Sequence, residues 1–282
     1  MAKNLSKHAG KEAVEKLGWW PAHRFLILRR LCQISIIVLF LLAPTINILQ
    51  GNLSSSVLLD TVPLTDPLIF LQILFSGHIP ELSAIFGVLI VVAFYALVSP
   101  RAFCAWVCPM NMVTDIAAWL KRKFEIKASY RWNNQLRYWL VAALLLGSAL
   151  SGSLVWPWID PVATLHRGLI FGIGMGWILV LLVFLMDLLL VDHAWCGHLC
   201  PLGATYGVIG QKSILRIKVV NREACTKCMD CYHVCPEPDV LRQPLKEGEL
   251  KVMDKNCISC GRCIDVCPEN VLAFTNRLTD KP

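Results

Sequence analysis

Long apolar stretches alternate with short polar ones up to about residue 210, after which the chain becomes evenly polar. A helix needs about 20 apolar residues to cross the hydrocarbon core of a bilayer. Runs near that length are Leu31–Leu49, Leu82–Val98, Tyr138–Trp156 and Gly168–Val191. The pattern predicts a segment 1–24, an all-α bundle of four transmembrane helices within residues 25–215, and a separate domain over 216–282.

The distribution of basic residues predicts the orientation of these helices. Lys and Arg are frequent in residues 1–30, 99–137 and 192–282, whereas residues 50–81 contain none. Because basic segments stay on the cytoplasmic side, we expect a multi-pass protein of the bacterial inner membrane with both termini cytoplasmic. The net charge of +7 follows this sidedness, so we expect no nucleic-acid partner. Hydrophobic residues make up 56% of the chain and charged residues 17%, which agrees with a membrane part.

Three local features refine this picture. Arg29-Arg30 before an apolar run is reminiscent of a twin-arginine signal, but the preceding polar region is too long, so we expect a retained anchor. Pro67–Phe75 is apolar but too short to span, which predicts an interfacial or re-entrant helix. The spacing of Gly168, Gly172 and Gly176 predicts close packing of a helix.

A duplicated cysteine pattern occupies the polar end of the chain. Each copy reads C-x-x-C-x-x-C-x-x-x-C-P. Four thiolates hold a [4Fe–4S] cluster, and in such a run the fourth Cys ligates the other cluster. The two predicted ligand sets are Cys225, Cys228, Cys231 and Cys267, and Cys257, Cys260, Cys263 and Cys235. A zinc site or a disulfide framework is disfavoured, because eight cysteines in a duplicated run are typical of neither. Residues 221–276 resemble the bacterial two-cluster ferredoxin module, which implies a small α+β domain.

A second duplicated motif is C-x-x-x-C-P, present once at Cys104 and Cys108 and again at Cys196 and Cys200. An aromatic residue precedes the first cysteine of each pair, so the motif belongs to an internal repeat. We expect both pairs at the cytoplasmic boundary. Together they offer four thiols for a further metal or cluster. A redox-active dithiol and a structural repeat remain as alternatives.

These features together resemble the NapH family, the membrane-integral quinol dehydrogenase subunits of periplasmic nitrate reductase systems. The resemblance covers residues 20–276 and is closest over Trp195–Gly203. It implies a subunit that oxidises quinol from the membrane quinone pool and is active only with its partners. Electrons would pass to a periplasmic ferredoxin-type subunit, and then to cytochrome c or nitrate reductase subunits. The alternative is a membrane ferredoxin for metalloenzyme maturation or redox sensing, of the nitrous oxide reductase or cytochrome oxidase assembly type.

Quinol oxidation releases protons, so a base must lie near the quinol headgroup. His is favoured because its pKa lies near neutrality. Candidate acceptors, each of which can also be a plain polar surface residue, are His78, Glu81, Asp160 and His166, and Asp187, Asp192, His193 and His198. No c-type haem motif, nucleotide-binding loop or catalytic triad signature is present in the sequence.

Overall fold

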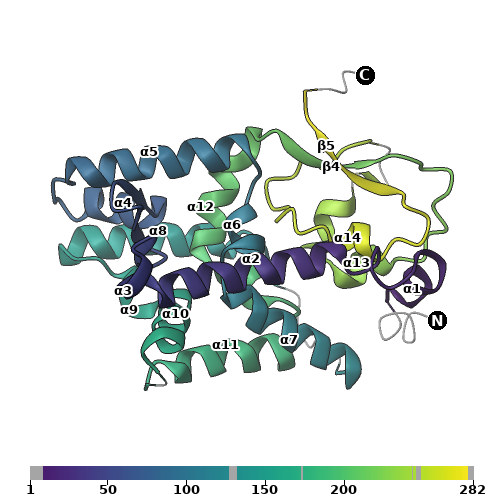
Figure 1. Ribbon diagram of the computed structural model, residues 1–282, viewed down its shortest axis with the longest axis horizontal. Helices are drawn as coiled ribbons and strands as arrows, with labels where there is room; N and C mark the ends of the chain where they lie inside the picture. The colour runs from purple at the N-terminus through teal and green to yellow at the C-terminus, as the bar shows by residue number, and fades with distance from the viewer. Residues whose placement is uncertain (1–8, 127–131, 173, 243, 246–248, 279–282) are drawn as a thin grey trace.

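The computed structural model describes residues 9–126, 132–172, 174–242, 244–245 and 249–278. The outer ends of the predicted segments 1–24 and 216–282 therefore lie outside the described residues. Figure 1 shows a large helical part that continues into a smaller part formed around two strands. The helix that begins at Arg24 runs from the smaller part into the larger one.

The helical part contains helices of very different length. They are α2 (Arg24–Leu41), α3 (Ala43–Ile46), α4 (Pro67–Phe75), α5 (Leu82–Leu97), α6 (Ala102–Trp106), α7 (Met110–Lys123), α8 (Leu136–Ser151), α9 (Trp156–Ile159), α10 (Pro161–Phe171), α11 (Trp177–Leu189), the π-helix η2 (Ala194–Leu199), α12 (Pro201–Ile209) and the 3-10 turn η3 (Gly210–Lys212). Their common core is built around large buried side chains, among them Leu68, Trp156 and Tyr206. This core also contains Cys108 and Cys200, one cysteine from each C-x-x-x-C-P motif.

The smaller part pairs β4 (Leu215–Val219) with β5 (Leu272–Asn276) in an antiparallel ladder. Between these strands lie α13 (Asp230–Val234), the 3-10 turn η4 (Pro238–Leu241) and α14 (Arg262–Asp265). Aliphatic side chains from both strands and the intervening loops form a second core, into which Cys257 and Cys263 are packed. Helix α1 (Lys11–Leu17) lies against this part, where Lys16 pairs with Glu269.

The prediction of four transmembrane helices is wrong. Within the part of the chain that the structure describes, no helix is both long enough and apolar enough to cross a bilayer. Helix α2 has 18 residues but includes Arg24, Arg29 and Arg30, whereas α5 and α8 have 16 residues each and α11 has 13. At about 1.5 Å per residue, a 16-residue helix is shorter than the roughly 30 Å of a hydrocarbon core.

Helix breakers inside the apolar runs explain the error. The first run is interrupted at Leu42, and Pro44 lies in the first turn of the short α3. Gly152, at a φ of 62°, ends α8 in the left-handed conformation that glycine adopts without strain. Gly172, at a φ of 97°, ends α10, and Gly176 caps α11, so the fourth run forms two helices.

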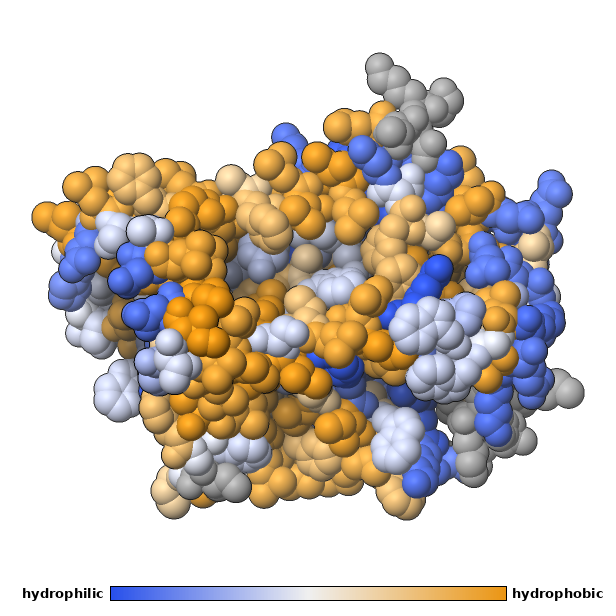
Figure 2. Space-filling view, viewed as in Figure 1, coloured by the Kyte–Doolittle hydropathy of each residue, from blue (hydrophilic) through white to orange (hydrophobic). Residues whose placement is uncertain are grey.

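The loop expected after the first run forms a small sheet instead. Strands β1 (Leu49–Gly51), β2 (Ser55–Leu58) and β3 (Val62–Thr65) pair in sequence order as an antiparallel meander. The helix expected over Pro67–Phe75 is present as α4, and the buried Asp66 caps its first turn. Figure 2 shows a broad apolar surface over the helical part, with hydrophilic side chains gathered on the smaller part and, in a second group, at the opposite end of the helical part.

Candidate metal centres

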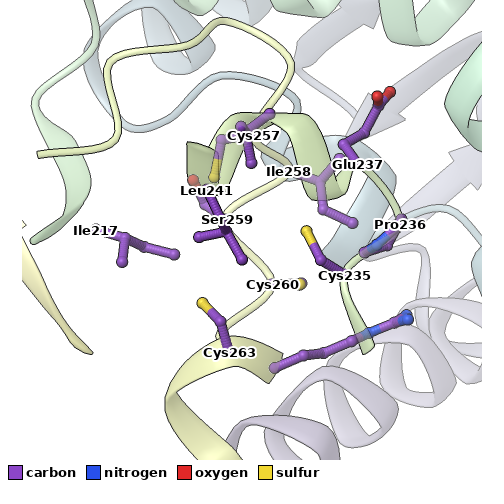
Figure 3. Close-up of a pocket in the computed structure, with 12 residues that line it drawn as sticks. Ile217, Cys235, Pro236, Glu237, Leu241, Cys257, Ile258, Ser259, Cys260 and Cys263 are labelled. Atoms are coloured by element: carbon purple, nitrogen blue, oxygen red, sulfur yellow. The ribbon is translucent and has the colours of Figure 1, made fainter. Parts of the chain in front are cut away.

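The side chains of Cys235, Cys257, Cys260 and Cys263 line one cavity at the edge of the smaller core. Figure 3 shows the four cysteines placed around this cavity, although Cys235 is more than twenty residues away from the others along the chain. This is one of the two ligand sets predicted from the sequence, including the crossed fourth cysteine. The remaining lining combines aliphatic side chains with the polar residues Glu237, Ser259 and Arg262.

Unusual backbone conformations bring these thiols together. Ser259 and Gly261 both have positive φ, at 49° and 74°, so the chain turns tightly between Cys257 and Cys263. Gly261 then caps α14. A Cβ at Gly261 would lie 2.5 Å from Cγ of Phe25 on α2, so glycine is required by both the φ and the close approach.

Burial makes these thiols difficult to ionise by themselves. It raises the pKa of Cys257 to about 11, and it raises the pKa values of Cys235 and Cys263 further, with added repulsion from neighbouring cysteine charges. Binding of iron would replace that proton, because iron–sulfur clusters are ligated by thiolates. The arrangement therefore fits a cluster better than it fits free thiolates.

The second predicted ligand set also gathers in the smaller part. Burial raises the pKa of Cys231 to about 12, and the nearby charges of Cys228, Cys267 and Cys225 contribute in the same direction. Cys267 accepts a hydrogen bond of 3.3 Å from the backbone N–H of Val271. Among the described residues, no three His, Cys, Asp or Glu side chains are placed to hold a single metal ion.

The two C-x-x-x-C-P motifs share one backbone hydrogen bond, although the first contains the end of the α-helix α6 and the second the end of the π-helix η2. The N–H of Cys108 donates to the carbonyl of Phe103 at 2.9 Å, and the N–H of Cys200 donates to that of Trp195 at 2.8 Å. Each bond spans five residues and joins the second cysteine to the aromatic residue before the first. The repeat seen in the sequence therefore includes this backbone hydrogen bond.

The fold brings the two motifs together. Burial raises the pKa of Cys108 well above its ordinary value, and charges on Cys104 and Cys200 raise it further. Burial likewise raises the pKa values of Cys196 and Cys200, in the latter case to about 12. Cys108 and Cys200 pack into the same hydrophobic core, so the fold brings the second cysteines of the two motifs into one region of the helical part.

The first motif also contacts the loop of the Cys257 set. The indole N–H of Trp106 donates to the carbonyl of Ser259 at 3.1 Å, and Ala105 packs with Ile258 and Cys260. On the other side, the side chain of Gln33 on α2 donates to two carbonyls of the motif. The first motif is therefore hydrogen-bonded both to α2 and to the smaller, ferredoxin-like part.

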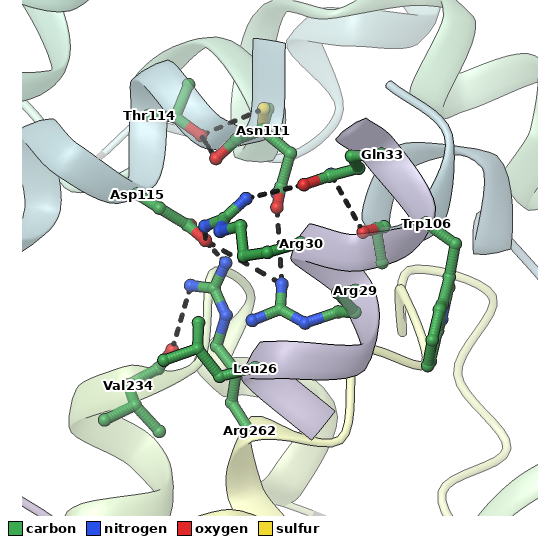
Figure 4. A network of polar contacts seen from close by, with 12 residues as sticks. Leu26, Arg29, Arg30, Gln33, Trp106, Asn111, Thr114, Asp115, Val234 and Arg262 are labelled. Carbon is green, nitrogen blue, oxygen red and sulfur yellow. Dashed lines mark hydrogen bonds and ion pairs between the residues drawn. The ribbon is translucent and has the colours of Figure 1, made fainter. Parts of the chain in front are cut away.

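A buried ion cluster joins the two parts beside this contact. Asp115 on α7 pairs with Arg29 and Arg30 on α2 and with Arg262 on α14, as Figure 4 shows. Burial raises the pKa of Asp115, but the three guanidinium groups outweigh burial and leave that pKa below its ordinary value. The two arginines that resembled a signal motif are thus structural.

The structure separates the predicted proton acceptors into exposed and buried groups. His78, Glu81 and Asp192 are exposed. His166 and His193 are buried, and burial lowers their pKa values to about 4. Neither ring nitrogen of His166 has a hydrogen-bond partner among the described residues.

Three further predicted acceptors lie near the second C-x-x-x-C-P motif or on α10. Burial raises the pKa values of Asp160 and Asp187 to about 7 each. Asp187 accepts from the N–H of Trp195 at 3.0 Å, next to Cys196. Burial lowers the pKa of His198, which lies inside the motif. The eight candidates do not form one cluster.

Asp66, which was not among the residues predicted from the sequence, directly precedes a residue that lines an apolar cavity. A cavity of about 460 Å³ lies between α4, α5, α8 and α12, and its lining contains no charged side chain. Asp66 immediately precedes the lining residue Pro67, is buried, and accepts a hydrogen bond of 3.1 Å from the hydroxyl of Tyr206. Burial raises the pKa of Asp66 to about 6. In the sequence, an Asp directly before a Pro is typical of a residue that caps a helix, so the pattern gave no sign of a further function for Asp66.

Comparisons with known proteins agree with the cysteine geometry. A family model for a 4Fe-4S binding domain matches residues 81–127 and 173–220, and one for a 4Fe-4S dicluster domain matches residues 217–268. The ferredoxin-type protein NapH of Haemophilus influenzae is 54% identical over 280 residues, 97% of each chain. The NapH protein of Escherichia coli K12 is 50% identical over 278 residues, again 97% of each chain.

A third relative has a different name. The methylamine utilization ferredoxin-type protein MauN of Methylorubrum extorquens is 42% identical over 280 residues, 98% of each chain. No solved structure matches the chain significantly.

Proposed function

The chain belongs to the NapH family of ferredoxin-type proteins, and from that premise we propose that it oxidises quinol and passes the electrons to an iron–sulfur partner protein. Its 4Fe-4S domains make it an iron–sulfur electron-transfer protein. The family resemblance predicted from the motifs is confirmed. The observation that supports the proposal most strongly is the convergence of Cys235 with Cys257, Cys260 and Cys263 on one cavity.

We assign one [4Fe–4S] cluster to each predicted cysteine set of the ferredoxin-like part. When bound, each cluster supplies a carrier of single electrons, whereas a quinol releases two electrons and two protons. The C-x-x-x-C-P cysteines are proposed to hold an additional metal centre, because a family model for a 4Fe-4S binding domain matches residues 81–127 and 173–220, the two segments that contain them.

The apolar cavity between α4, α5, α8 and α12 is the proposed quinol site. Sites for such ligands are concave and mostly apolar, with a few polar groups that fix orientation. The wall formed by α12 begins next to Cys200, and Tyr206 on the same helix reaches Asp66. With a pKa of about 6, Asp66 is suited to accept a proton near neutral pH.

The exposed surface of the helical part supports a proposal about where the protein is located. Many large apolar side chains are exposed on α5, α8 and α11, with Leu150 at 89% exposure. Soluble monomers rarely expose so much apolar surface, so we propose attachment to the bacterial inner membrane. The proposed acceptor is a periplasmic ferredoxin-type subunit that passes electrons to cytochrome c or nitrate reductase subunits.

Anaerobic mixing with a short-chain quinol analogue tests the function. In the presence of its partner subunit, the visible absorption of the protein should bleach as electrons arrive. Asp66→Asn should slow this bleaching, whereas replacement of the exposed Asp60 by Asn should not. Protein with intact clusters that the quinol analogue cannot reduce would contradict the proposal.

A further inference from the structure

We propose that a cavity between α1, α2, α7 and the ferredoxin-like part binds an anionic phosphate group, supplied by a lipid headgroup or by free inorganic phosphate. The cavity measures about 570 Å³, and ligand sites usually measure roughly 300–1,000 Å³. It shares no lining residue with the proposed quinol site. The two sites can therefore be tested independently.

Cationic side chains outnumber carboxylates on the walls of this cavity. Five Lys and Arg side chains face three carboxylates: Lys11, Arg29, Arg30, Arg122 and Arg262 against Glu15, Asp115 and Asp265. The carboxylate of Asp265 already accepts hydrogen bonds from the backbone N–H groups of Phe25 at 3.2 Å and Leu26 at 3.0 Å, at the start of α2. The lining therefore has a formal excess of positive charge, which favours an anionic occupant.

Arg29, the most buried of these cations, has donors that no protein group uses. Its Nη1 donates to the side-chain oxygen of Asn111 at 3.3 Å and lies 3.7 Å from the carboxylate of Asp115. Its Nε and Nη2 are buried and have no hydrogen-bond partner among the described residues. These two nitrogens form one edge of the planar guanidinium, and such an edge binds two oxygens of a phosphate or carboxylate group in parallel.

A second guanidinium has an unused donor on the same side. The terminal nitrogens of Arg262 bind Asp115 and the carbonyl of Val234, whereas its buried Nε has no partner in the described part of the chain. In Figure 4, the unused edge of Arg29 faces away from Asn111, on the side where Arg262 lies. Two guanidinium groups that share one carboxylate repel each other, so a bound anion would stabilise the pair.

Contacts between distant segments hold the walls of the cavity in place. The N–H of Gly10 donates to the carboxylate of Asp230 at 2.8 Å, and Lys16 pairs with Glu269, so α1 is held against the ferredoxin-like part. Asp115 joins α7, on another side of the cavity, to α2 and α14. The cations are therefore positioned before the ligand arrives, which reduces the free-energy cost of binding.

Large apolar side chains in the same lining favour a lipid as the source of the phosphate group. Leu26, Ile116 and Trp119 line the cavity and are 37%, 52% and 51% exposed. A free phosphate ion gains nothing from such side chains, whereas the apolar part of a lipid can pack against them. Basic pockets at a membrane surface bind anionic headgroups. The lipid source rests on the proposed membrane attachment, but the phosphate site itself does not.

Isothermal titration calorimetry of the anaerobically purified full chain, in detergent and buffer free of phosphate, tests the site. The probes are inorganic phosphate, the anionic lipid dihexanoyl phosphatidylglycerol, and dihexanoyl phosphatidylcholine, which has no net charge. We expect saturable binding of phosphatidylglycerol, weaker binding of inorganic phosphate, and the weakest binding of phosphatidylcholine. Inorganic phosphate that binds as tightly as phosphatidylglycerol would support the site but refute the lipid source. Phosphatidylcholine that binds as tightly as phosphatidylglycerol, or no saturable binding of either anion, would overturn the proposal.

Two variants test whether the binding occurs at this cavity. Arg122→Gln removes a cation that is not paired with Asp115, and it should weaken phosphatidylglycerol binding about tenfold, as expected for the loss of one charge-assisted contact. Arg29→Lys keeps the charge but lacks the two parallel donors, so it should also weaken binding. The control is Arg167→Gln, at an exposed position that does not line the cavity, and it should change nothing. Iron content equal to that of the wild type checks that each variant is folded, and wild-type affinity in folded Arg122→Gln would overturn the assignment to this cavity.

The quinol assay separates this inference from the proposed function. Arg122→Gln should bleach normally with the quinol analogue, because Arg122 does not line the quinol site. Weakened phosphatidylglycerol binding with normal bleaching would support a separate phosphate site. A wild type that bleaches normally but binds neither anion would refute the phosphate site and leave quinol oxidation in place.

Discussion

Replacement of Asp115 by Asn should destabilise the junction between the helical part and the ferredoxin-like part. The Asp115 side chain is 11% exposed and pairs with three guanidinium groups, of which that of Arg29 is fully buried. In the variant, Arg29 retains only its bond to Asn111, and Arg262 retains a long bond to the carbonyl of Val234. Breaking a buried ion pair from one side costs roughly 3–5 kcal/mol.

The assay is chemical unfolding of anaerobically prepared protein, followed by far-ultraviolet circular dichroism. Glu12→Gln serves as the control, because Glu12 pairs with Lys16 at the surface, where ion pairs contribute little. Equal unfolding free energies for the two variants would refute the view that the Asp115 cluster holds the parts together.

The contribution of Asp115 to the free energy of unfolding should change with pH in one direction only. The pKa of Asp115 is lower in the folded protein than in the unfolded chain, so its contribution is complete above the unfolded value of about 3.9. The contribution is lost as the pH falls through the folded pKa. The difference between wild type and Asp115→Asn should therefore be constant near neutral pH and shrink only under acidic conditions.

Further variants test single contacts. Cys235→Ala should remove about four iron atoms and leave the signal of the other ferredoxin cluster intact; loss of both signals would argue against the crossed ligand assignment. Gly210→Ala should lower the thermal midpoint markedly, because a Cβ there would lie 2.3 Å from the Cα of Pro100; an unchanged midpoint would contradict this packing. Trp106→Phe removes the hydrogen bond to Ser259 and should lower the unfolding free energy by about 1 kcal/mol. The control is Trp119→Phe, at an exposed position. If the two variants lower the unfolding free energy equally, the hydrogen bond contributes nothing.

The cysteine spacing is the basis for the two predicted ligand sets of the ferredoxin-like part. Spacing fixes how three sulfurs follow one loop, and the Pro after Cys235 and Cys267 marks the residues that leave it. The structure accordingly brings Cys235 to Cys257 across the core. The assignment of clusters to these residues remains a prediction that metal analysis must test.

The helix lengths were predicted poorly, because hydropathy records composition and not where a helix ends. Gly152 and Gly172 lie in apolar runs that look continuous, yet both adopt positive φ and end their helices. The meander of β1, β2 and β3 was missed because its strands have only three or four residues each. Strands of that length give almost no periodic signal.

Contacts between residues that are far apart in the chain could not be predicted from the sequence. Arg101 stands close to Cys104 in the chain, but its contacts with Glu237 and Asn256 depend on the whole fold. The same holds for Asp66, whose partner Tyr206 is 140 residues away. The motifs indicated candidate ligands, whereas the charged side chains around them became visible only in the folded structure.

The most direct test of the central claim is an electron paramagnetic resonance spectrum of the anaerobically purified, dithionite-reduced chain. The two cysteine sets of the ferredoxin-like part should give the signals of two neighbouring reduced [4Fe–4S] clusters, and Cys260→Ala should remove one of them. A spectrum of the reduced wild type without iron–sulfur signals would contradict the account.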